Sequence, residues 1–80
     1  MIPEQCRAAR AWLDWSQDDL AVSAKVSLST VKDFEKKRRN PIANNLEAMK
    51  RALEAEGISF RFSSDNKALG IDWTDSTKSA

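Results

Sequence analysis

The spacing of hydrophobic residues in the first part of the chain is that of helices. Cys6, Ala9 and Leu13 recur at three- and four-residue intervals after Pro3, a residue suited to a first helical turn. Arg10 lies on the same stripe. The pattern predicts a first helix from Pro3 to about Leu13.

A second, shorter helix is predicted to begin after Ser16. Serine is a good N-cap, and Asp19, three residues further on, completes an approximate capping box with aspartate in place of glutamate. Leu20 and its neighbours supply a short apolar stripe. This helix is expected to end near Ala24 or Lys25.

A third helix, capped by Ser27 or Ser29, turns Val31 and Phe34 inward and ends before the helix-breaking pair Asn40-Pro41. Between the second and third helices there is room only for a tight turn.

A fourth helix is predicted over 44–56, with Gly57 as its left-handed C-cap. After Gly57 the spacing of the apolar residues changes from that of a helix to every second residue, as in a strand. Two alternating runs then predict a β-hairpin with one apolar face. The apolar positions of these runs are Ile58, Phe60, Phe62, Leu69, Ile71 and Trp73. The small, polar residues 74–80 are expected to form a disordered tail.

The predicted fold class is therefore mostly α, with a bundle of four to five helices followed by a C-terminal β-hairpin. We divide the chain into a helical domain (1–57), a hairpin for dimerisation or packing (58–73) and a tail (74–80).

Composition narrows the function. The chain has 80 residues, which suits one small domain, and no apolar run near the length that spans a bilayer. It has no histidine, one cysteine, and glycines only at positions 57 and 70. We therefore expect no metal site, no cofactor and no catalytic residues, because the usual bases, ligands and phosphate-binding loops are missing.

Charge is unevenly distributed along a chain whose net charge is only +1. Residues 25–39 carry six basic and two acidic side chains, whereas the remainder carries seven basic and ten acidic ones. Such segregation indicates a surface for a polyanion, although a basic run alone is also compatible with a solvated face.

The second and third helices with their three-residue connection have the pattern of a helix-turn-helix unit. The inward positions are apolar and the close helix crossing has a small residue, Ala21. The apolar positions are Leu20, Ala24, Val26, Val31 and Phe34. The alternative is an ordinary pair of packed helices.

Residues 10–58 resemble the Cro/cI-type (Xre) helix-turn-helix domain of phage repressors and bacterial regulators. The residues that carry this resemblance are Arg10, the run Trp15-Ser16-Gln17-x-x-Leu20-Ala21, Val26-Ser27, Val31, Phe34-Glu35, and Asn40-Pro41 leading into Leu46. The resemblance implies a compact helical bundle that binds operator DNA, usually as a dimer. One departure is Lys25, which stands where the family usually has glycine.

The resemblance also implies roles for individual residues. The expected base-contacting residues on the third helix are Ser27, Leu28, Ser29, Lys32 and Asp33. The expected phosphate-contacting residues are Gln17, Lys25, Lys36, Lys37, Arg38 and Arg39. Arg10 and Glu35 correspond to a partly buried ion pair that joins the first helix to the end of the third.

The hairpin is expected to do more than complete the helical domain. Its apolar face could pack on its own helices, or an edge strand could pair with a second copy, and we favour the dimer. The expected dimerisation residues are Phe60, Phe62, Leu69, Ile71 and Trp73.

The function expected from the sequence is that of a transcription regulator, most simply a repressor that binds a palindromic operator as a dimer. The expected partners are double-stranded DNA and a second copy, and the expected location is the cytoplasm, for a protein that is bacterial or phage-encoded. The alternative is an antitoxin-like or accessory protein whose hairpin binds another protein and whose DNA binding is secondary.

Overall fold

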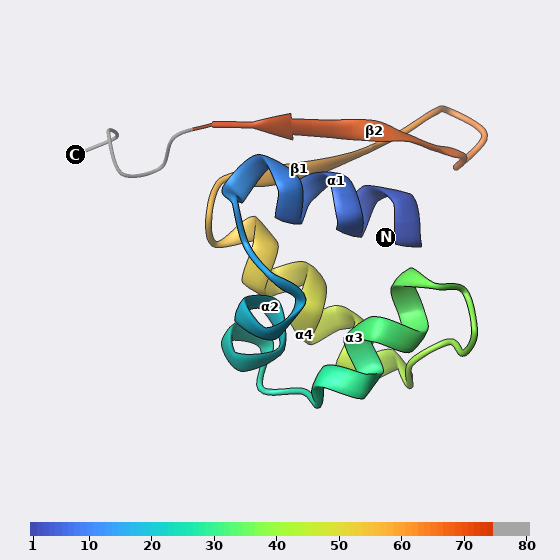
Figure 1. The fold of residues 1–80 in the computed structure, drawn as a ribbon. Helices are drawn as coiled ribbons and strands as arrows, with labels where there is room; N and C mark the ends of the chain where they lie inside the picture. The colour runs from blue at the N-terminus through green and yellow to red at the C-terminus, as the bar shows by residue number, and fades with distance from the viewer. Residues whose placement is uncertain (75–80) are drawn as a thin grey trace.

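Four helices precede a two-stranded antiparallel sheet in the computed structural model, which describes residues 1–74 (Figure 1). The elements are α1 (Pro3–Leu13), α2 (Gln17–Ala24), α3 (Leu28–Glu35), α4 (Ala43–Glu54), β1 (Ile58–Phe62) and β2 (Ala68–Trp73). The predicted fold class, a helical bundle followed by a hairpin, is confirmed. Residues 74–80 were expected to form a disordered tail, and residues 75–80 of this stretch lie outside the described residues.

The starts of α2 and α3 are fixed by serine caps. At α2, Ser16 Oγ accepts from the Asp19 N–H and Asp19 Oδ2 accepts from the Ser16 N–H, both at 2.9 Å, so the predicted capping box is present. Ser27, not Ser29, caps α3 and accepts from the Thr30 N–H. Between the two helices Lys25 has a φ of 59°, the left-handed conformation that favours glycine, at a cost of about 1 kcal/mol.

The end of α4 differs from the prediction. The helix covers Ala43–Glu54, not 44–56, and its C-cap is Ala55 in the right-handed region, so Gly57 is not the C-cap. Gly57 instead lies in the turn that follows, with a φ of 97° that directs the chain into β1. Its carbonyl accepts from the Thr74 N–H at 2.9 Å, which extends the hairpin ladder beyond β2.

The hydrophobic core collects residues from all four helices and β1. Its buried members are Cys6, Ala9, Leu20, Ala21, Ala24, Val31, Phe34, Met49, Leu53 and Ile58. Every buried side-chain nitrogen or oxygen among the described residues has a hydrogen-bond partner. The spacing of apolar residues read from the sequence therefore matches the core.

The hairpin packs on its own helices, the first of the two arrangements left open by the sequence. Ile58 is buried, and its neighbours Phe60 and Ile71, which pair across the sheet, pack against the core. A register irregularity between Arg61 and Phe62 interrupts the alternation, and Leu69 is 60% exposed. In Figure 1 the hairpin lies across α1, on the opposite side of the bundle from the start of α3.

Side chains at the two ends of α1 tether it to the hairpin. Near the start, the buried Gln5 side chain donates through Nε2 to the carbonyl oxygens of Arg61 (3.2 Å) and Gly70 (3.1 Å). At the other end, the rings of Trp12 and Trp73 lie 5.8 Å apart. Trp12 is itself 62% exposed, so this ring contact lies at the surface of the molecule.

Candidate nucleic-acid interface

The surface of α3 carries the residues expected to contact bases. Ser29 and Lys32 are exposed, whereas Leu28 and Asp33 are half-buried, and Leu28 also packs against the core. Ser27 is exposed too, but its hydroxyl caps the helix and lies 2.8 Å from Thr30 Oγ1. The Ser29 hydroxyl lies 3.1 Å from Ser27 Oγ, so of the expected base-contacting residues on α3, Lys32 and Asp33 present polar groups that are not engaged in this way.

A buried charged cluster fixes the position of α3 in the bundle. The Glu35 side chain accepts from Arg10 Nε at 2.6 Å and from Arg10 Nη2 at 2.7 Å, a bidentate ion pair. Gln17 Nε2 donates to Glu35 Oε1 at 3.0 Å, and the Cys6 thiol donates to Oε2 at 3.2 Å. One carboxylate thus receives hydrogen bonds from α1 and α2 and holds both against the C-terminal end of α3.

The cluster also sets the charge states of its members. Burial by itself raises the pKa of Glu35, but the hydrogen bonds from Arg10, Gln17 and Cys6 outweigh it and lower the pKa below its ordinary value. The hydrogen bond to Glu35 raises the pKa of Arg10. Burial, followed by the Glu35 carboxylate, raises the pKa of the Cys6 thiol, which therefore stays protonated and unreactive at neutral pH.

Gln17 lies at the start of α2, where the sequence led us to expect a phosphate contact. Its amide is half-buried, and one of its N–H groups is turned toward Glu35. A second N–H remains on the same nitrogen. The neighbouring Asp18 is exposed beside it, and its negative charge opposes phosphate binding at this helix end.

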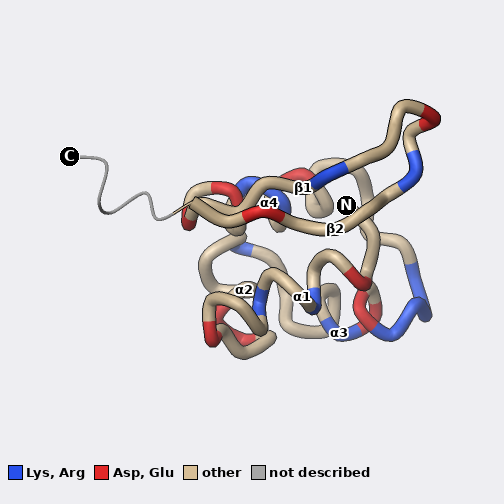
Figure 2. The backbone as a smooth tube through the Cα atoms, turned by 90° about the horizontal axis from the view of Figure 1, so that it is seen from above, with Lys and Arg blue, Asp and Glu red and all other residues tan. Residues whose placement is uncertain are grey.

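The basic residues do not all face the same way. Lys25, Lys36, Arg38 and Arg39 are exposed. Lys37 has a φ of 61° and its Nζ lies 2.6 Å from Glu4 Oε2 of α1, a solvent-exposed pair that contributes little to stability. Figure 2 shows the basic stretch after α3 in blue, away from the acidic first turn of α2.

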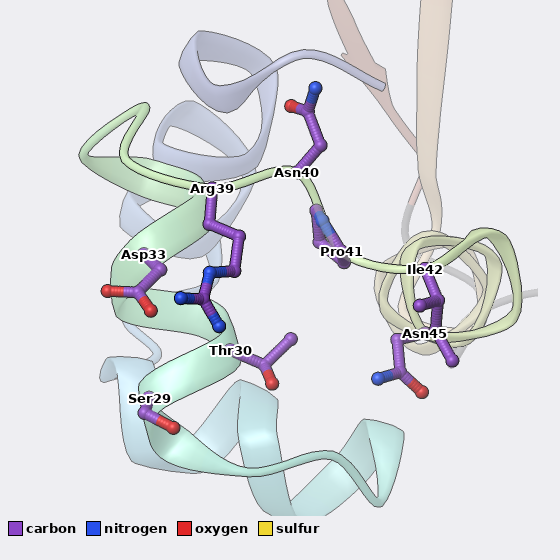
Figure 3. A pocket seen from close by; sticks show the side chains of 8 residues that line it. All are labelled: Ser29, Thr30, Asp33, Arg39, Asn40, Pro41, Ile42 and Asn45. Atoms are coloured by element: carbon purple, nitrogen blue, oxygen red, sulfur yellow. The ribbon is translucent and has the colours of Figure 1, made fainter.

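A hollow of about 200 Å³ opens beside α3, between it and the start of α4 (Figure 3). Its walls come from α3, from the loop after α3 and from the first turns of α4. The lining residues are Ser29, Thr30, Asp33, Arg39, Asn40, Pro41, Ile42 and Asn45. The expected base-contacting face of α3 therefore continues across this hollow onto α4.

Five of these lining residues were not assigned to the DNA-binding face by the sequence analysis, namely Thr30, Asn40, Pro41, Ile42 and Asn45. The first turn of α4 has no acidic residue and its N-cap, Ile42, makes no side-chain cap hydrogen bond. That combination leaves a helix end favourable to anions and was readable from the sequence, because residues 42–45 contain two asparagines and no carboxylate.

Among residues 1–74 no three histidine, cysteine, aspartate or glutamate side chains come together as a possible metal site. Within the same range, no helix combines the length and apolar composition that crossing a bilayer requires.

Comparison with known proteins agrees with this geometry. Residues 7–59 match the family model described as helix-turn-helix, a stretch that runs from α1 into β1. The curated proteins contain no significant match to the chain.

Proposed function

Because this chain belongs to the Cro/cI-type helix-turn-helix family, a family of DNA-binding regulators, we propose that it is a sequence-specific transcription regulator that reads operator DNA with α3. The observation that carries the proposal is the exposed polar face of α3, set on a helix whose end is fixed by the Arg10–Glu35 pair. A rigidly held helix can present side chains to a groove in a single register, which sequence discrimination requires.

Within this proposal, each residue of α3 contacts the base atoms that its side-chain chemistry suits. Lys32 donates to guanine O6 or N7, Asp33 accepts from cytosine N4, and Leu28 contacts a thymine methyl. Ser29 can donate or accept and discriminates less. Ser27 is proposed as a base contact with its capping role retained.

The basic side chains around α3 are proposed to contact phosphates. Lys36 and Arg38 follow α3 directly, and Lys25 lies in the turn before it, all three exposed. Lys37 can join them by leaving Glu4, since an exposed pair is easily exchanged. Gln17 is assigned the same role through its second amide N–H. Such contacts fix the orientation of the protein on DNA without specifying sequence.

We further propose that the protein is a homodimer that binds a palindromic site and represses by blocking promoter access. Five of the seven exposed large hydrophobic residues among the described residues lie at α1 or the hairpin: Ile2, Trp12, Phe62, Leu69 and Trp73. A hollow of about 240 Å³ beside Trp12 and Trp73 is lined also by Ile71 and Asp72. This surface lies away from the start of α3 (Figure 1), so a dimer joined there leaves both reading helices free.

The dimer leads to a prediction about mass in solution. We expect the wild type to show twice the 9.0 kDa of one chain, and Leu69→Lys to shift it to the monomer, because a charge cannot be buried unpaired at an apolar interface. Leu69 is 60% exposed in the single chain, so its replacement leaves the fold intact. Light scattering after size exclusion gives the masses.

Val22→Lys is the matched control, because Val22 is 69% exposed on α2 and lies outside the hairpin surface. It is expected to remain dimeric. A wild type that stays monomeric at the highest soluble concentration, or a Leu69→Lys variant that stays dimeric, would rule out dimerisation through this surface.

Selection from a random duplex library at two salt concentrations tests the proposed function. We expect a palindromic motif to be enriched at both. We also expect Lys32→Ala to relax base preference at one position of each half-site, and Arg38→Ala to weaken all sequences alike while lowering the salt slope by about one. Equal effects of the two variants on specific and non-specific DNA would contradict these roles.

If DNA binding in the selection disappears at the higher salt concentration and no motif is enriched, the protein is attracted to phosphates without regard to sequence. In that case the accessory-protein alternative becomes the better account, with the exposed residues of α1 and the hairpin as the surface for another protein.

A further inference from the structure

The loop after α3 turns back along the helix instead of leaving it. Lys37 is left-handed with a φ of 61°, and both following N–H groups donate to the Asp33 carbonyl, Arg38 at 2.8 Å and Arg39 at 3.4 Å. These bonds hold the backbone of Arg39 beside the last turns of α3. Pro41, which follows, restricts the chain further before α4 begins.

The side chain of Arg39 continues in the same direction. Figure 3 shows it bending over α3, with the guanidinium between the side chains of Asp33 and Thr30. All three residues line the hollow of about 200 Å³ beside α3. Arg39 therefore differs from Lys37, whose ammonium is turned to Glu4 of α1. The basic run contains side chains with different surroundings, although its sequence suggests one shared role.

Arg39 and Asp33, which line the same hollow, together offer a definite set of hydrogen-bonding groups. A guanidinium offers two parallel N–H donors, and a carboxylate beside it offers an acceptor. In the major groove a G·C pair presents two acceptors on guanine, N7 and O6, followed by a donor on cytosine, N4. Two donors and one acceptor side by side match that edge, and no other base pair presents the same order.

We propose that Arg39 is a specificity-determining residue that reads guanine of a G·C pair together with Asp33, and is not a phosphate contact. This inference rests on the proposed function, since it assigns a further residue to the same DNA-reading face. It replaces the role that the sequence suggested for Arg39 and extends the base-reading surface from α3 to the loop that follows.

Two variants at Arg39 test the inference by library selection and by binding titrations. The titrations compare the selected operator with operators in which one G·C pair at a time is replaced by another base pair. Arg39→Lys keeps the charge and loses the two parallel N–H donors of the guanidinium. We therefore expect the preference for guanine at one position to fall by about 5- to 150-fold, with the salt dependence of the affinity nearly unchanged. Arg39→Ala is expected to lose the same preference. Arg39 is exposed, and its side chain donates no hydrogen bond and forms no ion pair within residues 1–74, so neither change is expected to disturb the fold, which thermal melting checks.

Arg38→Ala is the matched control, because it removes the same side chain from the adjacent exposed position. We expect it to weaken all sequences and to leave the motif unchanged. If Arg39→Ala behaves in the same way, with uniform weakening and a lower salt slope, Arg39 contacts phosphate and the inference is overturned while the proposed function stands. If the wild type enriches no motif, both are overturned.

Discussion

Glu35→Ala is expected to destabilise the protein by about 3–5 kcal/mol, because it removes one partner of a buried ion pair and leaves the other unpaired. The side chains of Arg10 and Glu35 are only 17% and 2% exposed. Gln17 and Cys6 lose their acceptor at the same time. A chain of this size has roughly 4–12 kcal/mol of stability in total, so much of it would be lost. Urea denaturation followed by circular dichroism measures the difference.

Glu47→Ala is the control for this prediction. Glu47 pairs with Arg51 one turn away on α4 at 3.3 Å, with both side chains well exposed, so its loss is expected to cost only about 0.3–0.5 kcal/mol. Similar effects of the two substitutions would show that the buried cluster contributes no more than a surface pair.

The same carboxylate predicts a pH dependence. The pKa of Glu35 is lower in the folded state than in the unfolded state. The stability that this carboxylate contributes is therefore fully present above its unfolded pKa of about 4.3, and it is lost as the pH falls through its folded pKa. We therefore expect stability to fall on acidification below about pH 4.3, and to fall less in Glu35→Gln, which keeps the shape and has no proton to gain. If the stability of the two proteins falls equally on acidification, the loss of stability is due to other carboxylates.

Gly57→Ala is the second substitution with a large expected effect. An added Cβ would lie 1.9 Å from the Thr74 carbonyl oxygen, and the φ of 97° is one that side chains rarely tolerate. The backbone would have to move, which breaks the Thr74-to-Gly57 hydrogen bond and disturbs the bond from Trp73 Nε1 to the Glu56 carbonyl. We expect a loss of about 2–4 kcal/mol, measured by thermal and urea unfolding.

Gly70→Ala is the matched control, because a Cβ built at Gly70 meets no atom within 4 Å. We expect its stability to stay within about 0.5 kcal/mol of the wild type. If both alanine variants unfold at the same temperature as the wild type, the chain reversal at Gly57 is more adaptable than its geometry implies.

Local signals in the sequence were sufficient for the helices and strands. The capping serine at position 16 and the change of period after Gly57 depend on neighbours within a turn, so they were readable without the fold. For the third helix the sequence left the cap open between Ser27 and Ser29, and the structure has Ser27. The core followed from the same stripes. The end of α4 was not predicted correctly, because the C-cap is decided by how the next residues meet β2, which is remote in sequence.

The candidate site was less accessible to sequence reasoning. The matched family pattern supplied Arg10 and Glu35, but no spacing rule indicates that Gln17 and Cys6 share the same carboxylate, or that Lys37 turns toward Glu4. Arg39 and Lys37 are two residues apart in one basic run, and a left-handed backbone at Lys37 separates their directions. Such differences arise from tertiary contacts and loop geometry, which composition cannot report.

The tethering of α1 by the hairpin also has a consequence for biosynthesis. Gln5 of the first helix finds its acceptors at Arg61 and Gly70, and Ile58 fills the core, so residues near the start of the chain are satisfied only by residues made much later. A nascent chain that ends before Ile58 leaves the core open and the Gln5 amide without these partners. We therefore expect the domain to fold only after nearly all of it has left the ribosome, and products that end before Ile58 to lack a stably packed α3.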